Sequence, residues 1–398
     1  MTYIIDAVRT PIGNFGGTLK NIRTDDLAAI PIRELIKRTN IDPKKIDDVI
    51  LGCANQAGED NRNVARMASL LAGIPYTVPG ETVNRLCASG MSAVIHAHRA
   101  ASSKDGNLFI SGGVENMTRG PWVISKVSKA FGRDAQMHDS SFGWRFINPK
   151  MKELYGTDGM GQTAENLAEK YNITREDQDL FAFNSQRKAS RAQERGRFKD
   201  EIVSVKIPQR KGDPIIFDKD EFIRSNTSPE VLAKLKPAFK KNGTVTAGNA
   251  SGLNDGAAAM LLASENGVKE NNLVPIAKII SSAVVGVEPR IMGIGPVEAS
   301  FKALKKAKLK MSNIDIIELN EAFAVQSLAC IREWNLNDDD PRINPNGGSI
   351  ALGHPLGVSG TRIIHSAALE LQKQNKKYAL ITMCIGVGQG YATIIEKI

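Results

Sequence analysis

The chain has 398 residues, of which 42% are hydrophobic and 24% charged, and 52 Lys and Arg against 43 Asp and Glu leave a formal net charge of +9. This length predicts two or three domains with cores of their own, and it excludes a peptide hormone, a disulfide-rich mini-protein and a single DNA-reading module. The positive charge would suit nucleic acid, a membrane surface or a phosphorylated small ligand, and the count alone does not choose among them.

The N-terminal segment and the cysteines indicate the compartment. Charge appears at Asp6 and Arg9 before a signal-peptide core could form, and no run of eighteen apolar residues occurs, so we expect a cytoplasmic protein. The cysteines form no C-x-x-C pair, so we expect no metal site and reduced thiols, each a small core residue or a nucleophile. They are Cys53, Cys87, Cys330 and Cys384.

One pattern of strands and helices occurs twice along the chain. Three pairs of segments match at a spacing of about 270 residues, which is hard to assign to chance. The pairs are residues 46–52 and 314–319, 87–90 and 357–360, and 109–113 and 381–386. Apolar strands that alternate with helices predict two copies of one α/β unit, layered around buried sheets.

Residues 120–242 differ from both copies, and we interpret them as an inserted unit. They hold a predicted polar helix over residues 175–195, and the return to core loop and strand begins after residue 242. The predicted domains are residues 1–119 with 243–270, the insertion 120–242, and residues 271–398. Basic residues of the insertion include Arg187, Lys188, Arg191, Arg195, Arg197, Lys199, Arg210 and Lys211.

Cys87 lies at a predicted strand-to-helix turn. The unpaired N–H groups and partial positive charge of a helix N-terminus would lower the pKa of its thiol and favour the thiolate, which is the nucleophilic form. A buried structural cysteine is the alternative, and for an isolated cysteine it is the commoner case.

Cys384 ends the corresponding strand of the second copy and leads into the glycine-rich segment 386–390. Glycines at alternate positions let backbone N–H groups approach a ligand, as an oxyanion hole requires, although a plain turn after a core strand would look the same. Tyr391 stands where the third glycine of G-x-G-x-x-G would fall, so the segment is not a dinucleotide fingerprint.

His354 and Asn320 are the remaining candidates for chemistry. His354 lies between glycine and proline, where a histidine of a core helix is not expected, which favours a catalytic role. Asn320 follows the predicted strand 314–319, at the end of the strand where α/β sites usually lie. If the two copies are related by pseudo-symmetry, the segments bearing these residues, Cys87 and Cys384 converge on one cleft.

Four segments together resemble the signature motifs of the thiolases, in that family's order, and the resemblance covers essentially the whole chain. The segments are Asn84-Arg85-Leu86-Cys87-Ala88-Ser89-Gly90, Asn320-Glu321-Ala322-Phe323, Gly353-His354-Pro355 and Cys384-Ile385-Gly386-Val387-Gly388. The resemblance implies a duplicated α/β thiolase fold. Two five-stranded α/β/α/β/α halves would share one active site, and a loop domain would be inserted.

The resemblance also implies roles for individual residues. Cys87 would be the nucleophile that becomes acylated, His354 would activate it and help to hold the thioester oxygen, and Cys384 would be the acid and base at the α-carbon. Asn320 would position a water in a first oxyanion hole, and the N–H groups of Cys87 and Gly386 would form a second. The family uses no permanently bound cofactor, takes CoA and acyl-CoA as substrates, and suggests a homodimer or homotetramer.

Contacts with coenzyme A follow from the same resemblance. Its pantetheine tunnel would be lined by Ser251, Met292, Ala322 and Phe323, and its other contacts would come from Arg224, Thr227, Ala238 and Phe239 in the insertion. We also expect the basic residues of the insertion to face the phosphates of coenzyme A, which would explain part of the +9 charge.

Substrate preference is implied by three segments. Gly159-Met160 departs from the short-chain biosynthetic branch, which has His-Met there, and residues 52–66 and 143–155 are more similar to the degradative and 3-oxoadipyl-CoA branches. We expect cleavage of a 3-oxoacyl-CoA to acetyl-CoA and a shortened acyl-CoA in fatty-acid β-oxidation. Synthesis of acetoacetyl-CoA and cleavage of 3-oxoadipyl-CoA are the alternatives.

Two other classes of protein are alternatives to a thiolase. A ketosynthase or HMG-CoA synthase is close in chemistry, but decarboxylating ketosynthases typically use a second histidine where Cys384 stands. A basic protein that binds nucleic acid or a membrane surface is the alternative from another class. It is disfavoured because no aromatic-interleaved basic stripe and no basic amphipathic anchor occurs, so we expect neither partner.

Overall fold

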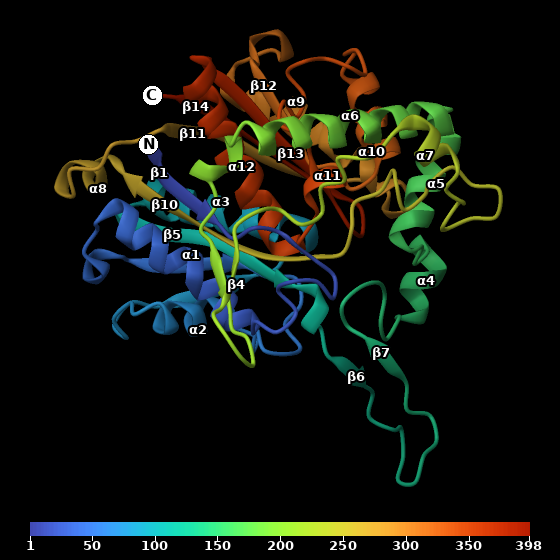
Figure 1. Ribbon diagram of the computed structural model, residues 1–398, viewed down its shortest axis with the longest axis horizontal. Helices are drawn as coiled ribbons and strands as arrows, with labels where there is room; N and C mark the ends of the chain where they lie inside the picture. The colour runs from blue at the N-terminus through green and yellow to red at the C-terminus, as the bar shows by residue number, and fades with distance from the viewer.

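The computed structural model describes residues 1–398, and a ten-stranded sheet runs through it in the order β12-β13-β14-β11-β1-β10-β5-β3-β4, with β2 beside β10 (Figure 1). No helix combines the length and apolar character needed to span a membrane. The strands are β1 (Thr2–Arg9), β2 (Gly13–Asn14), β3 (Asp48–Gly52), β4 (Gly80–Val83), β5 (Leu108–Asn116), β10 (Asn254–Ser264), β11 (Ala277–Gly286), β12 (Ile316–Leu319), β13 (Tyr378–Ile385) and β14 (Gln389–Lys397).

The strand pairing shows the duplication that the sequence predicts. In the first half β3 is parallel to β5, and β5-β10-β1 continue antiparallel. In the second half β12 is parallel to β13, and β13-β14-β11 continue antiparallel. The halves join where Thr2, Tyr3 and Ile4 of β1 pair with β11.

The second half differs from the expected five strands at its outer edge. The counterpart of β4 is reduced to a single parallel bridge between Ile317 and Ile343. Pro341 and Pro345 flank that bridge, and a proline has no N–H to donate to a neighbouring strand. The edge therefore ends in a loop rather than a strand.

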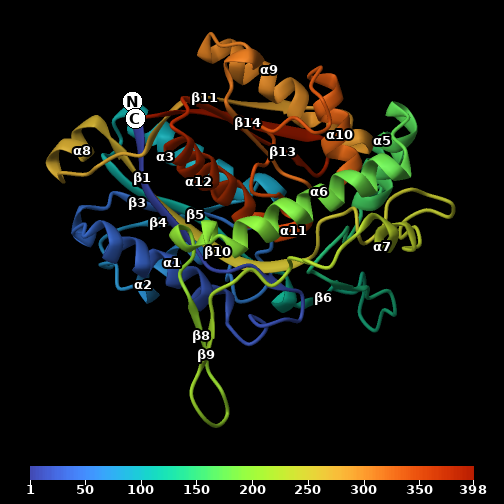
Figure 2. The same ribbon diagram turned by 45° about the horizontal axis from the view of Figure 1, so that its top comes forward.

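Helices form three layers around the two halves of the sheet, so the α/β/α/β/α order is made by both halves together around one shared central layer. The central layer is α3 (Ser89–Ser103) and α12 (Leu356–Gln374), whose apolar residues join one core cluster with strands of both halves (Figure 2). The outer layers are α1 (Thr24–Thr39) and α2 (Val64–Leu71) on the first half, and α9 (Gly295–Ala307) and α10 (Ala324–Glu333) on the second.

Glycines allow the two central helices to approach each other closely. A Cβ atom on Gly90 would lie 2.4 Å from the carbonyl oxygen of Gly357, and one on Gly360 would lie 2.3 Å from the backbone nitrogen of Met91. Only glycine fits at such a contact. Because α3 begins just after Cys87 and α12 just after His354, this packing also sets the distance between the two loops.

Residues 120–242 contribute no strand to the main sheet. They form two hairpins, β6 (Trp122–Ile124) with β7 (Met137–Asp139) and β8 (Val205–Ile207) with β9 (Ile215–Phe217), which project from the body (Figures 1 and 2). The expected polar helix is present as α6 (Arg175–Glu194). The remaining α-helices of the chain are α4 (Pro149–Tyr155), α5 (Met160–Tyr171), α7 (Pro229–Ala233), α8 (Glu265–Glu270) and α11 (Ser349–Leu352).

The insertion packs on both halves instead of forming a core alone. Val205, Ile207 and Phe217 belong to the outer core of the first half, whereas α5 and α6 contact α10 of the second. We propose that the chain divides at the predicted domain limits. Residues 120–242 would then be a set of inserted loops and helices that hold the two halves together.

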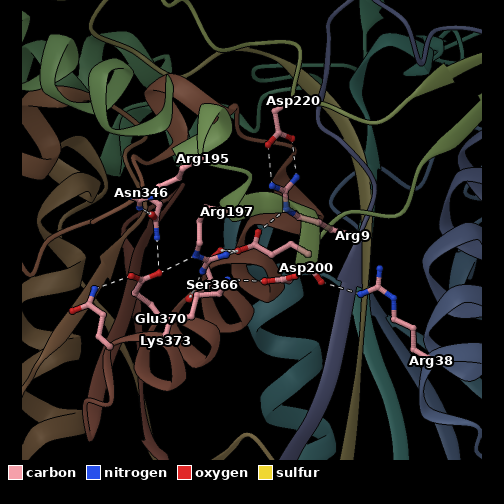
Figure 3. Close-up of polar contacts among 12 residues, drawn as sticks. Arg9, Arg38, Arg195, Arg197, Asp200, Asp220, Asn346, Ser366, Glu370 and Lys373 are labelled. Atoms are coloured by element: carbon pink, nitrogen blue, oxygen red, sulfur yellow. Dashed lines mark hydrogen bonds and ion pairs between the residues drawn. The ribbon is translucent and has the colours of Figure 1, made fainter. Parts of the chain in front are cut away.

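A buried ion-pair network ties the insertion to both halves (Figure 3). Arg9, at the end of β1, donates through both terminal nitrogens to Asp220, at 2.7 and 2.9 Å, and through Nε to Glu201 at 3.0 Å. Glu201 also accepts from Arg197 at 2.7 Å, and Arg197 donates to Glu370 of α12 at 2.9 Å. All five side chains are buried, so each charge depends on its partners.

Candidate active site

Cys87, His354 and Cys384 line one cavity of about 290 Å³, here called the catalytic cavity. Cys87 comes from the turn between β4 and α3, His354 from the loop before α12, and Cys384 from the end of β13. The structure thus brings together three candidates that lie up to about 300 residues apart in the sequence. Most of the other lining side chains are apolar, including Met117, Phe142, Met160 and Leu356.

The turn that presents Cys87 is backbone-strained. Leu86 has φ of 48°, a left-handed conformation that is unusual for a bulky residue, and residues Leu86–Ala88 form a single 3₁₀ turn. The hydroxyl of Ser89 accepts from the N–H of Arg85 at 2.9 Å and donates to the carbonyl of Leu86 at 2.7 Å. These bonds hold the strained turn and aim Cys87 at the cavity.

The pKa of Cys87 differs from the sequence prediction. Burial raises the pKa of its thiol to about 11, although the backbone N–H groups of Gly386 and of Cys87 itself act in the opposite direction. The prediction of a lowered pKa is therefore wrong for the resting protein, because the enclosure of the sulfur outweighs the N–H groups around it. A neighbouring base is needed to form the thiolate.

His354 is placed to be that base. Burial, and then the charge of Arg362, lower the pKa of His354 to about 3, so the ring is neutral at pH 7. Its Nδ1 lies 2.6 Å from the Ser359 hydroxyl, and that hydroxyl donates to the carbonyl of Pro355. Ser359 therefore accepts from Nδ1–H, so Nε2 is the ring nitrogen whose lone pair can take a proton.

Asn320 lies behind His354 and is fixed by a chain of side chains. Its Nδ2 is 3.5 Å from Nε2 of His354, and its Oδ1 accepts from the Ser349 hydroxyl at 2.6 Å. Ser349 in turn accepts from Arg362 at 3.3 Å. Asn320 does not line the catalytic cavity itself, but it contacts His354, which does.

Cys384 is a fully buried thiol beside Cys87. Burial raises its pKa well above the usual range, and the proximity of Cys87 raises it further. The group is protonated at neutral pH, so it can donate a proton to a carbanion that forms nearby. Cys53 and Cys330, in contrast, are buried in the apolar cores and take no part in the cavity.

Asn254 has a role that the sequence reasoning missed. Its Oδ1 accepts from the backbone N–H of His354 at 2.9 Å, and its Nδ2 donates to the carbonyl of Gly13 at 3.0 Å. The preceding Gly353 has φ of 97°, and a Cβ atom there would lie 2.6 Å from the amide carbon of Asn254. Asn254 therefore holds the turn that carries His354, and a lone asparagine at the start of a strand offered no signal of this.

The expected coenzyme A contacts divide between two places. Ser251, Met292, Ala322, Phe323 and Phe239 line the catalytic cavity. A separate peripheral cavity of about 240 Å³ is lined in part by Arg224 and Thr227. Ala238 is exposed and lines neither cavity.

The basic residues of the insertion do not share one role, and the expectation that they face the phosphates of CoA is wrong for Arg197, which is buried. Arg197 is buried in the ion-pair network, Arg195 bonds to the Asn346 side chain, and Lys188 donates to the carbonyl of Ile343 at 2.8 Å. These contacts arise because the insertion packs on the second half. Among His, Cys, Asp and Glu side chains, no group of three or more is placed to hold a metal ion.

Comparison with known proteins gives matches over the whole chain. The family model for the N-terminal domain of thiolase matches residues 2–266, and the model for the C-terminal domain matches residues 273–397. A β-ketoadipyl-CoA thiolase of Acinetobacter baylyi is 56% identical over 397 residues, which cover 100% of this chain and 99% of that protein. A 3-oxoadipyl-CoA/3-oxo-5,6-dehydrosuberyl-CoA thiolase of Escherichia coli K12 is 55% identical with the same coverage.

A solved structure extends the similarity from the sequence to the fold. The crystal structure of human mitochondrial 3-ketoacyl-CoA thiolase in complex with CoA superimposes with a TM-score of 0.93 at 40% sequence identity. The match covers 100% of this chain and 98% of that chain. The layered fold and the position of each half are therefore shared along the full length.

Proposed function

This chain belongs to the thiolase family, as the family models that match residues 2–266 and 273–397 show, and we propose that its substrate is 3-oxoadipyl-CoA. It is an acyltransferase that cleaves 3-oxoacyl-CoA, with CoA as its second substrate. Relatives at 55 and 56% identity are named for 3-oxoadipyl-CoA, which supports this substrate. They do not support the expectation of fatty-acid β-oxidation.

The first half-reaction would transfer the acyl group to Cys87. Nε2 of His354 accepts the thiol proton as Sγ attacks the ketone carbon C3, and the N–H groups around the sulfur lie near the oxygen that gains charge. The bond between C2 and C3 then breaks, and its electron pair stays on C2. Cys384 donates its proton to C2, acetyl-CoA leaves, and a succinyl group remains on Cys87.

The second half-reaction would restore the enzyme. The thiolate of Cys384 accepts the proton of CoA, and the CoA sulfur attacks the thioester on Cys87. Succinyl-CoA leaves, and the protonated His354 returns its proton to Cys87. Since acetyl-CoA departs before CoA reacts, the kinetics should be ping-pong.

The observation that carries the proposed mechanism is the convergence of Cys87, a neutral His354 and a buried, protonated Cys384 on one cavity. Cys87, His354 and Cys384 all line it, and the pKa values of the latter two match their tasks: His354 is neutral and Cys384 is protonated near pH 7. The homo-oligomer expected from the sequence stays a prediction, and light scattering on the purified protein would measure it.

Substrate preference tests the proposal directly. The purified protein is expected to convert 3-oxoadipyl-CoA and CoA to acetyl-CoA and succinyl-CoA, with a kcat/KM at least about tenfold above that for 3-oxohexanoyl-CoA. The two substrates have the same number of carbons and differ in the terminal carboxylate. Mass spectrometry of the products, with initial rates, measures both. A preference for 3-oxohexanoyl-CoA or acetoacetyl-CoA would contradict the proposal.

Asn254 should affect turnover rather than binding. Replacing it with alanine removes the acceptor for the N–H of His354, so the imidazole is displaced and kcat should fall about tenfold to a hundredfold. KM for CoA should stay nearly unchanged, because Asn254 lines neither the catalytic nor the peripheral cavity. Steady-state kinetics measure both values, and Asn337→Ala at an exposed site is the control. Equal kinetics in the two variants would refute the positioning role.

A further inference from the structure

A second cavity of about 160 Å³ also reaches Cys87. It shares Cys87, Phe142, Met160 and Leu356 with the catalytic cavity, so the two spaces meet at the nucleophile. Its remaining lining comes from several segments and includes Ala54, Asn55, Glu115, Ser140 and Arg145. These include parts of the segments whose sequence suggested a branch-specific substrate preference.

The second cavity is the space available to the acyl chain. The catalytic cavity holds the expected pantetheine contacts Ser251, Met292 and Phe323, so the arm of CoA would fill it. An acyl group on Cys87 must then extend into the adjoining space. In other proteins a cavity of about 150 Å³ binds benzene, so this one suits a short acyl chain.

Arg145 is the one cationic side chain in the lining of the second cavity. It is half-buried, and its single hydrogen bond in the structure runs from Nη1 to the carbonyl of Ser140 at 2.9 Å. Ser140 is itself held by Asn55, whose Nδ2 donates to its carbonyl and hydroxyl oxygens at 3.2 and 3.1 Å. A guanidinium has five N–H donors, so four remain for a ligand.

The one acidic residue in this lining does not neutralise Arg145. Glu115 accepts from the backbone N–H of Asn55 through Oε1 at 2.9 Å. Its Oε2 accepts from Ala54 and Gly357 at 3.0 and 2.9 Å. Both carboxylate oxygens are therefore engaged by the backbone, and no ion pair joins Glu115 to Arg145. The cation faces a largely apolar space without an anionic partner from the protein.

We propose that Arg145 binds the terminal carboxylate of the acyl chain and so selects dicarboxylic 3-oxoacyl-CoA substrates. The inference rests on the proposed function, because it assumes that the acyl chain reacts at Cys87. A guanidinium fits a carboxylate through two parallel hydrogen bonds, and such a pair is strong where water is excluded. A substrate that ends in a methyl group would leave the half-buried cation without an anionic partner, which costs binding.

Replacing Arg145 with leucine tests the assignment. In Arg145→Leu, kcat/KM for 3-oxoadipyl-CoA should fall about a hundredfold, whereas that for 3-oxohexanoyl-CoA should change by no more than about threefold. Arg145→Lys should recover part of the loss, because a single charge remains. Arg133→Leu, at an exposed site of the same insertion, is the matched control and should behave as the unmodified protein.

The outcomes separate this inference from the proposed function. If the unmodified protein prefers 3-oxoadipyl-CoA and Arg145→Leu keeps that preference, the role of Arg145 is wrong and the proposed function stands. Equal losses on both substrates in Arg145→Leu, without recovery in Arg145→Lys, would mean a structural role and also overturn the inference. If the unmodified protein has no preference for 3-oxoadipyl-CoA, the proposed function and the inference both fall.

Discussion

Replacing Cys87 with serine is expected to lower the thiolysis rate by at least about a thousandfold. Burial already raises the pKa of the thiol to about 11, so even the cysteine depends on His354 to lose its proton. A serine hydroxyl is far less acidic, and the same neutral imidazole cannot deprotonate it to a useful extent. The substitution exchanges the side-chain sulfur for oxygen and leaves the shape of the cavity nearly unchanged.

Initial rates and intact-protein mass spectrometry measure the effect of Cys87→Ser. After brief exposure to acetyl-CoA, the unmodified protein should gain one acetyl group, and Cys87→Ser should gain none. Cys330→Ser is the matched control, because Cys330 is a buried thiol on α10 that does not line the cavity. An acetyl group that persists in Cys87→Ser, or that is lost in Cys330→Ser, would show that another cysteine is the nucleophile.

Replacing Glu201 with glutamine is expected to reduce the free energy of unfolding by about 3 kcal/mol. Glu201 is the carboxylate between Arg9 and Arg197, with contacts of 3.0 and 2.7 Å, and both arginines are buried. A neutral amide leaves part of their charge uncompensated where water cannot reach it. The loss should loosen the insertion from both halves, because the network joins β1, residues 197–220 and α12.

The same carboxylate predicts how stability depends on pH. Burial alone would raise the pKa of Glu201, but the charges of Arg197 and Arg9 outweigh it and lower the pKa to about 2. The folded-state pKa lies below the ordinary value of 4.5, so the stabilisation is fully present above about pH 4.5 and is lost as pH falls toward 2. Glu201→Gln should lack this component of the acid dependence.

Thermal and denaturant unfolding followed by circular dichroism, between about pH 7 and pH 3, measures both effects of Glu201→Gln. Glu194→Gln is the control, because Glu194 is an exposed acidic residue of the same insertion with no ion pair. Unfolding midpoints for Glu201→Gln that equal those of Glu194→Gln at neutral pH would show that the network does not stabilise the fold.

Local pattern was sufficient for the elements and for the duplication. The apolar run 314–319 becomes β12, the polar stretch 175–195 becomes α6, and the turn at Cys87 leads directly into α3. Each follows from short-range periodicity and from turn chemistry that a single segment contains. The missing edge strand near Ile343 could also have been read from Pro341 and Pro345, whose effect is local.

The pKa of Cys87 and the roles of the arginines could not be obtained in this way. The sequence correctly predicted that backbone N–H groups near Cys87 act to lower the pKa of its thiol. The burial that raises this pKa more strongly comes from side chains of distant segments. Likewise Arg197 and Arg145 look equivalent as basic residues of one insertion. Packing decides that Arg197 is paired inside the fold and that Arg145 lines the cavity beside Cys87.

The sequence by itself determined the family, since Cys87, His354 and Cys384, the proposed nucleophile, base and acid, stand in ordered motifs whose residue types are specific. It also determined that two similar α/β units are present. Only the tertiary structure decided which charges are buried, which are paired and which are free, because these depend on contacts between residues such as Arg9 and Asp220, more than 200 positions apart. Charge counts are additive along a chain, whereas the solvation of each charge depends on what folds against it.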